Sequence, residues 1–272
     1  MDLKQVPTVC TKKEFLLEHP RGAYTATRTL NCSKVMNWTL HLNRLVSSWT
    51  ALDWSNSLGQ YDPQAQYRPA LNPTIVCSNE IAAFKAWNLE ILKETITNAL
   101  ITAIAEYYSY TGALPKDGIT NEATITILLL QPDENNNNNT VQLLIHLEHQ
   151  LDHTFFPCVV ALYGAPRILP SVKDSQWSRD RRPLELRLAP PVSELLLIDH
   201  YNNIYEGLTS NFFCIIQENN NFVVLTAPQE FVLNGTILKN VQAACVSVGI
   251  SFRFEFPNVE GVGGWVGAFV TS

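Results

Sequence analysis

Charge is scarce in this sequence of 272 residues. Asp, Glu, Lys and Arg together make up 16% of the chain, against about a quarter in an average soluble domain. The 19 Lys and Arg are outnumbered by 25 Asp and Glu, so the net charge is -6. A chain without surplus positive charge has little with which to neutralise rows of phosphate groups. We therefore expect neither a nucleic acid nor an anionic membrane as its partner, and the apolar surface left by so few charges favours self-association.

Long apolar runs are missing as well. The first residues lack the apolar stretch of a secretory leader, and no later segment reaches the roughly 18 apolar residues of a membrane span. We expect a cytoplasmic protein, with import into an organelle left open. The six cysteines form no C-x-x-C pair, which is typical of small core residues in a reducing compartment.

Hydrophobic residues make up 46% of the chain, enough for a substantial core. In residues 39–50 apolar side chains recur at helical intervals behind Thr39 or Asn37 as a cap, and a longer helical pattern runs from about Asn79 to Tyr110. The segments ATITILLLQ and TVQLLIHLEH predict a hairpin around the polar tract DENNNNN, and FPCVVALYG predicts a third strand. We expect an N-terminal α+β domain over residues 1–165.

A stretch with five prolines and five arginines, from APRIL to APPVS, predicts a junction. After it, ELLLID, NFFCIIQ and FVVLTAP read as a meander, followed by a helix from about Gly235 to Val248 and the strand SFRFEF. These elements form the predicted second domain, over residues 166–272. The fold class is therefore α+β with two domains.

Two patterns that look like ligand sites are weak. His146, His149 and His153 would share one face of a helix, but their segment reads as strand, where residues three apart point to opposite faces. We expect no metal site. The glycines of GVGGWVG do not follow the dinucleotide spacing, and a loop before a strand explains them.

The most informative segment is ELLLIDHYNNIYEGLTSNFFCII, which sets an acidic residue and a glycine between apolar strands. A buried carboxylate at Glu206 needs a cation or hydrogen-bond donors. One interpretation is an ion pair with a nearby arginine, and the other is a functional acid. Further on, Asn234 or Gly235 begins a helix, which is either an ordinary cap or the start of a phosphate site.

Several separated segments resemble the class IV, fold type IV pyridoxal-phosphate aminotransferases. This group includes the branched-chain and D-amino-acid aminotransferases and aminodeoxychorismate lyase. The segment from Glu206 to Asn211, EGLTSN, fits the family signature E-G-x-[ST]-x-N. The segments GAYTATR, HLNRL, Val172-Lys173-Asp174, LNGTILKNV and GAFVTS resemble other family motifs in the family's order, over nearly the whole chain. The resemblance implies a two-domain D-amino-acid aminotransferase-like fold with a barrel-like second domain, and a homodimer.

The resemblance also implies a role for each matching residue. Lys173 would form the Schiff base with pyridoxal 5'-phosphate and move the α-proton of the substrate. Glu206 would face the pyridine nitrogen, and Arg44 would bind the phosphate together with the amides of Thr236 and Ile237. Tyr24 corresponds to a position that faces substrate in some relatives. A solvated lysine, a helix-surface ion pair and a core tyrosine are the plainer alternatives for Lys173, Arg44 and Tyr24.

The implied reaction moves an amino group between an amino acid and a 2-oxo acid. The alternatives are an aminodeoxychorismate-lyase-like reaction on the same cofactor, and an impaired homologue that acts through dimerisation. This last hypothesis comes from two departures from the family pattern. Ile237 stands where relatives often have threonine, and the sequence stops at Thr271-Ser272 where the family continues. We expect a C-terminally truncated chain that lacks one phosphate ligand.

Overall fold

The chain folds into two compact units. The computed structural model describes residues 10–52, 77–82, 89–112, 121–130, 140–150 and 157–272. The first unit comprises residues 1–154 and 173–179, and the second comprises residues 155–172 and 180–272. Residue 165, where the sequence places the domain boundary, lies inside the second unit. The α+β class expected from the sequence is confirmed by its two sheets, one antiparallel and one mixed, and their helices.

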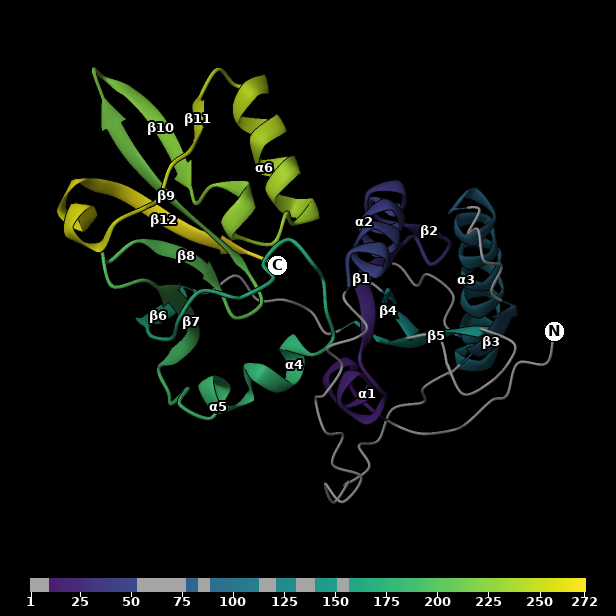
Figure 1. Cartoon of the computed structure of the whole chain (residues 1–272). Coiled ribbons are helices and arrows are strands. Elements are labelled where there is room, and N and C mark those ends of the chain that lie inside the picture. Colours follow the sequence, from purple (N-terminus) through teal and green to yellow (C-terminus); the bar gives the residue numbers. More distant parts are fainter. Residues whose placement is uncertain (1–9, 53–76, 83–88, 113–120, 131–139, 151–156) are drawn as a thin grey trace. The chain divides into compact units, whose positions relative to one another are not determined.

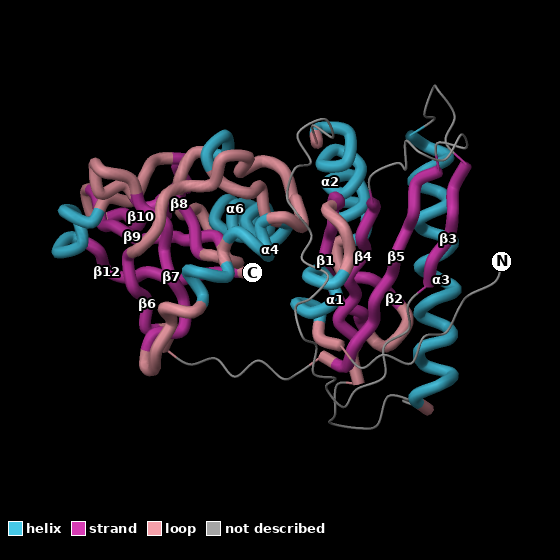
Figure 2. The backbone as a smooth tube through the Cα atoms, turned by 60° about the horizontal axis from the view of Figure 1, so that its bottom comes forward, coloured by secondary structure: helices cyan, strands magenta, loops and turns pink. Residues whose placement is uncertain are grey.

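The first unit is built on an antiparallel sheet in the order β2-β1-β4-β5-β3. Figure 2 shows β1, β4, β5 and β3 side by side. The predicted hairpin is confirmed as β4 and β5, which pair antiparallel, whereas its loop at residues 133–139 lies outside the described residues. The bounds of the strands are β1 (Gly22–Leu30), β2 (Lys34–Val35), β3 (Cys77–Ala82), β4 (Ala123–Leu130) and β5 (Thr140–His149).

The described residues around this sheet form the helices α1 (Lys12–Glu18), α2 (Trp38–Ala51) and α3 (Leu89–Thr111) (Figure 1). The helix expected over residues 39–50 is confirmed as α2, with Asn37 at its N-cap. Tyr24 packs in one apolar cluster with Phe15 of α1, while its neighbour Thr25 contacts His41 of α2. Because successive side chains of a strand point to opposite faces, α1 and α2 cover opposite faces of the sheet. Complete burial of Phe15 contributes about 1.5–3 kcal/mol.

The prediction of one helix from Asn79 to Tyr110 is wrong in its first part. Residues 77–82 form β3, which pairs antiparallel with β5 through partners such as Ile81 and Val141. Only α3 is helical. The apolar spacing of this region fits a helical period, but the hydrogen bonds offered by β5 decide the conformation of β3, as tertiary contacts often override a local pattern.

The second unit contains a sheet in the order β11-β10-β9-β8-β7-β6, with β12 paired to β9. The strand predicted in FPCVVALYG is confirmed as β6, but it pairs in parallel with β7 and therefore belongs to this second sheet. The remaining strands of the meander and the last helix are confirmed. Bounds are β6 (Val159–Leu162), β7 (Val192–Ile198), β8 (Ile204–Gly207), β9 (Asn211–Glu218), β10 (Asn221–Thr226), α6 (Thr236–Ser247), β11 (Ser251–Phe254) and β12 (Trp265–Thr271).

The alternation of side chains along β9 creates the two faces of this sheet. Phe212 and Cys214 pack into one apolar cluster, while Phe213 packs against Leu238 of α6 in another. The segment GVGGWVG forms a short 3-10 helix, Val259–Gly264, and then enters β12, as expected of a loop before a strand. The Pro- and Arg-rich stretch carries two short helices, α4 (Trp177–Asp180) and α5 (Arg182–Glu185).

Candidate functional site

The backbone of Lys173 is held by two elements of the first unit. The amide of Tyr24 in β1 donates to the carbonyl of Lys173 over 2.9 Å, and the amide of Lys173 donates to Oγ of Ser48 in α2 over 3.0 Å. One residue further on, Ser175 donates from its amide to the carbonyl of Gly22. The segment around Lys173 thus extends the sheet at β1, and the position of Lys173 is fixed on both sides of its Cα.

Gly22 is required by this arrangement. A Cβ at this position would lie 2.3 Å from the carbonyl oxygen of Leu129, which is backbone and cannot move aside. The amide of Gly22 in turn donates to Oγ of Ser175 over 2.9 Å. The glycine that begins the GAYTATR segment therefore allows β1 to approach both of its neighbours.

The side chain of Lys173 lies against Tyr24. Its Nζ is 4.7 Å from the centroid of the Tyr24 ring, a distance at which an ammonium is attracted to the aromatic face. Tyr24 itself is only 4% exposed. The next residue, Asp174, accepts two hydrogen bonds from Arg21, over 2.9 and 2.7 Å, so its carboxylate is used to fix that arginine.

Arg44 lies on the same side of α2 as His41 and Ser48, because positions 41, 44 and 48 fall on one helical face. Its Nη2 donates to Oγ1 of Thr25 over 3.2 Å and lies 3.3 Å from Nδ1 of His41. Burial lowers the pKa of Arg44 to about 10, and the nearby Tyr24 opposes this change. Arg44 therefore remains a cation at neutral pH.

His41 links Arg44 electrostatically to Lys173. Burial, together with the positive charges of Arg44 and Lys173, lowers the pKa of His41 to about 3. Lys173 and Arg44, two of the residues that the sequence singles out, thus lie near a neutral histidine in the first unit, and Tyr24 interacts with both of them.

Glu206 lies in the second unit, in β8. Its Oε2 accepts a hydrogen bond from the amide of Leu233 over 3.0 Å, and its Oε1 lies 3.6 Å from Nη1 of Arg167. The side chains of Arg167 and Glu206 are 7% and 5% exposed. The cation that a buried carboxylate requires is therefore Arg167, which also donates to the carbonyl of Val172 over 2.8 Å.

The spacing of the EGLTSN segment follows from its contacts. Asn211 donates from Nδ2 to the carbonyl of Leu233, whose amide donates to Glu206. Glu206 and Asn211 therefore bind the amide and the carbonyl of the same residue. Glu194 of β7 accepts from the amide of Leu208 over 3.1 Å and from the hydroxyl of Ser210 over 2.8 Å. These bonds fix the turn between β8 and β9 and the approach to α6.

Two glycines make room for these bonds. A Cβ at Gly207 would lie 2.2 Å from Oγ of Ser210 and 2.8 Å from Oε2 of Glu194. A Cβ at Gly235 would lie 2.2 Å from Oδ1 of Asn211. Both glycines therefore allow a close approach of side chains that are already hydrogen-bonded.

Gly235 is the N-cap of α6, and no side chain caps this helix end. Thr236 is 7% exposed, and Ile237 is partly buried. The first amides of a helix carry partial positive charge and suit a phosphate. Thr236, Ile237 and Glu206 all lie in the second unit, whereas Lys173, Arg44 and Tyr24 lie in the first.

Several polar residues that hold these side chains were not predicted from the sequence, namely His41, Ser48, Glu194 and Arg167. In α2 the signal was present, since His41 and Ser48 lie at helical spacing from Arg44. Glu194 is a carboxylate within an apolar strand, which is also a readable signal. Arg167 had none, because it lies in an arginine-rich stretch without periodicity.

The histidines considered as metal ligands are separated. His146 is fully buried, stacks on Phe15 and lies with Nε2 2.9 Å from the carbonyl oxygen of Cys10, whereas His149 is exposed. His153 lies outside the described residues. Within the described ranges, no group of three His, Cys, Asp or Glu side chains is arranged to hold a metal ion.

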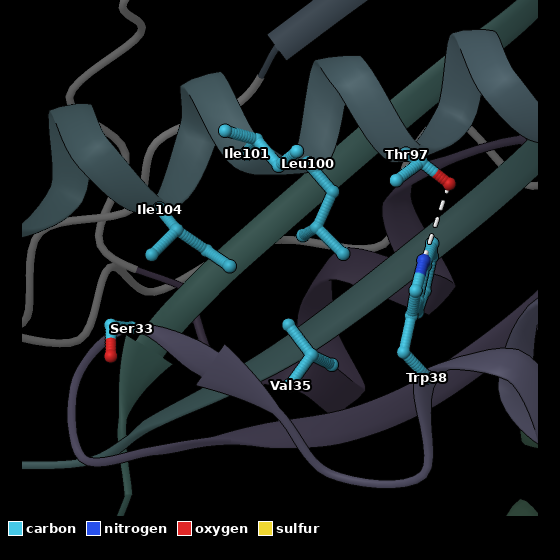
Figure 3. Close-up of a pocket in the computed structure, with 7 residues that line it drawn as sticks. All are labelled: Ser33, Val35, Trp38, Thr97, Leu100, Ile101 and Ile104. Carbon is cyan, nitrogen blue, oxygen red and sulfur yellow. Dashed lines mark hydrogen bonds between the residues drawn. The ribbon is translucent and has the colours of Figure 1, made fainter.

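A cavity of about 230 Å³ opens in the first unit between β2, α2 and α3 (Figure 3). Its wall is mainly apolar, and the indole Nε1 of Trp38 donates to Thr97 over 3.2 Å across it. Apolar walls of this kind offer no acid or base, so the cavity takes no part in the site. The lining includes Val35, Trp38, Thr97, Leu100, Ile101 and Ile104.

No protein-family model and no curated protein sequence matches this chain. Among solved structures, a fold IV-transaminase from Curtobacterium pusillum is similar with a TM-score of 0.62 and 15% identity, over 92% of this chain and 75% of that one. A putative 4-amino-4-deoxychorismate lyase from Legionella pneumophila is similar with a TM-score of 0.61 and 14% identity. This match covers 98% of this chain and 84% of that one. A PLP-bound hypothetical aminotransferase from Mycobacterium tuberculosis is similar with a TM-score of 0.60 and 11% identity. The match covers 100% of this chain and 82% of that one.

These similarities confirm the expected fold, which is that of the fold type IV enzymes. At 11–15% identity they establish the fold and leave the reaction to be argued from the residues. Among the helices that the structure describes, none has the length and apolarity needed to cross a membrane.

Proposed function

We propose that the chain is a pyridoxal-phosphate-dependent aminotransferase, which moves an amino group from an amino acid to a 2-oxo acid. The observation that carries this proposal is the placement of Lys173. Its backbone is fixed by β1 and α2, and its amine lies over Tyr24 in a cluster that also contains the partly buried cation Arg44. The fold, shared with transaminases, supports the same conclusion.

The residues fit the chemical groups of pyridoxal 5'-phosphate. The cofactor has an aldehyde, an anionic phosphate and a ring nitrogen that accepts a proton. Lys173 supplies an amine, Arg44 a planar cation suited to phosphate, and Glu206 a carboxylate whose charge Arg167 compensates. When bound, the cofactor supplies an electron sink for the carbanion that forms at the substrate Cα.

Each protein group then has a definite task. Lys173 would hold the cofactor through its Nζ and would move the proton at the substrate Cα. Glu206 would hold a proton at the pyridine nitrogen. Arg44 would bind the phosphate, with the amides of Thr236 and Ile237 as further donors. The ring of Tyr24 limits the positions of the Lys173 amine and contacts substrate beside it.

Reductive trapping tests this proposal. The purified protein is incubated with pyridoxal 5'-phosphate, reduced with borohydride, digested and analysed by mass spectrometry. We expect a pyridoxyl group on Lys173 and a visible absorbance band before reduction, both lost in Lys173→Ala and retained in the exposed control Lys239→Ala. Equal labelling of Lys239 and Lys173, or no labelling at saturating cofactor, would refute the proposal.

A lyase is the second candidate, because a neighbour described as a putative 4-amino-4-deoxychorismate lyase is as similar in fold as the transaminases. The two reactions differ in their products. A transaminase converts a 2-oxo acid to the matching amino acid, whereas the lyase releases pyruvate from aminodeoxychorismate without any amino acceptor. Formation of pyruvate in the absence of a 2-oxo acid would favour the lyase.

A further inference from the structure

Thr25, His41 and Arg44 form a closed triangle of polar atoms in the first unit. Nδ1 of His41 lies 2.9 Å from Oγ1 of Thr25, and Nη2 of Arg44 lies 3.2 Å from that oxygen and 3.3 Å from Nδ1. Thr25 is fully buried and His41 is 5% exposed. Each atom of the triangle thus contacts the two others, and the bond between Thr25 and His41 is buried while Arg44 is partly buried.

The donors and acceptors of this triangle can be assigned. A guanidinium only donates, so Nδ1 of His41 must accept, and its ring must carry the proton on Nε2. The two hydrogens on Nη2 of Arg44 then go to Nδ1 and to Oγ1 of Thr25, while the hydroxyl of Thr25 donates to Nδ1, so that two donors share the single lone pair of Nδ1. A protonated imidazole could no longer accept from Arg44, although its Nδ1–H could still donate to Oγ1 of Thr25. Burial and the charges of Arg44 and Lys173 keep the pKa of His41 low, at about 3, and the ring neutral.

We propose that His41 and Thr25 are positioning residues, which orient the guanidinium of Arg44 for the phosphate group of the cofactor. This inference rests on the function proposed above, and His41 acts through Arg44 without touching the cofactor. Arginine has several rotatable bonds, and binding a phosphate requires one conformation of its planar fork. Bonds that fix Nη2 beforehand remove this ordering cost from binding and therefore raise the affinity for phosphate.

The test compares pyridoxal 5'-phosphate with pyridoxal, which lacks only the phosphate. Dissociation constants for both are measured by absorbance titration of the wild type, His41→Leu, His41→Asn and the exposed control His149→Leu. In His41→Leu we expect affinity for pyridoxal 5'-phosphate to fall on the order of tenfold, while affinity for pyridoxal changes less than about twofold. His41→Asn, whose Oδ1 replaces Nδ1 as acceptor, should recover most of the loss.

A merely structural role of His41 predicts a different result. Both ligands would then be weakened by the same factor in His41→Leu, and this outcome would overturn the inference. Equal losses in His41→Asn and His41→Leu would also overturn it, because the acceptor atom would not matter. The control His149→Leu should bind both ligands as the wild type does.

Thr25→Val removes the second corner of the triangle and keeps the side-chain shape. If His41→Leu does not fold, Thr25→Val and His41→Asn decide the question, and a phosphate-selective loss in Thr25→Val supports the inference. A loss of the same size for pyridoxal refutes it. Wild-type protein that binds neither ligand would refute the proposed function itself, whereas equal wild-type affinity for the two ligands would refute only the role of Arg44 and its positioning residues.

Discussion

Acid should destabilise the first unit through His146, and His146→Gln should remove this effect. Burial lowers the pKa of His146 to about 4, against 6.5 for the free side chain, although its bond to the carbonyl of Cys10 acts in the opposite direction. Between pH 6.5 and 4 the unfolded chain therefore binds a proton at this residue and the folded chain does not. The stability contribution is present above pH 6.5 and is lost as the pH falls.

The size of the effect follows from these two pKa values. Each pH unit in this window costs about 1.4 kcal/mol, so acidification from pH 7 to pH 5 lowers the free energy of unfolding by about 2 kcal/mol through His146 alone. The side-chain amide of Gln can donate to the Cys10 carbonyl in place of Nε2, and it does not titrate. We expect His146→Gln to be less stable than the wild type at pH 7, because it loses the stacking on Phe15, and to close this gap by pH 5.

Urea denaturation followed by circular dichroism at pH 7, 6 and 5 measures this. The comparison between proteins at each pH cancels the titration of all other groups. His149→Gln is the matched control, since His149 is exposed in the same strand, and its stability should run parallel to that of the wild type. A gap between His146→Gln and the wild type that stays constant from pH 7 to pH 5 would refute a neutral, buried His146.

Three further substitutions test the contacts around the site. Gly207→Ala should lower the free energy of unfolding of the second unit by about 1–3 kcal/mol, because the added methyl group overpacks against Ser210 and Glu194. The control Gly263→Ala, which has open space around it, should leave the stability unchanged. Equal midpoints of urea denaturation for the two variants would contradict the crowding at Gly207. Arg167→Met should lower the free energy of unfolding by about 3–5 kcal/mol because it leaves a buried charge on Glu206. Adding Glu206→Gln should restore part of this stability in the same urea assay. A double variant no more stable than Arg167→Met would disprove the coupling. Ser48→Ala should speed hydrogen exchange at the amide of Lys173 and lower the free energy of unfolding by about 1–3 kcal/mol. The control Ser47→Ala, at an exposed neighbouring position, should change neither the exchange rate nor the stability. Unaltered protection of the Lys173 amide in Ser48→Ala would show that the bond is unimportant.

Elements with a strong local pattern could be predicted from the sequence. Helix α2 was predictable because its apolar residues repeat at helical intervals and Asn37 precedes it, and the β4–β5 hairpin because its two strands are consecutive and apolar. Strand β3 was not, since it exists through pairing with β5, which follows much later in the chain. A local period cannot report a partner that is distant in sequence.

The same distinction applies to the candidate site. Lys173, Arg44 and Glu206 stand in short motifs, so the resemblance to a known family pointed to them. Their partners come from other segments, as Ser48 does for Lys173 and Arg167 for Glu206. The completed fold decides which face of α2 packs against β1. It also decides which residue of the arginine-rich stretch lies beside a carboxylate.

The charge on Glu206 is not required by its hydrogen bond to Leu233, and its counterpart is the buried cation Arg167. The amide of Leu233 needs only an acceptor oxygen, and an uncharged Gln would supply one. A carboxylate instead costs desolvation, for which the buried pair with Arg167 at 3.6 Å offers only partial compensation. Asn211, which holds the other side of Leu233, does so with a neutral amide. The two residues are not interchangeable, because Asn211 donates to the Leu233 carbonyl whereas Glu206 accepts from the Leu233 amide. In the function proposed above, the negative charge that Arg167 balances would also serve the ring nitrogen of the cofactor.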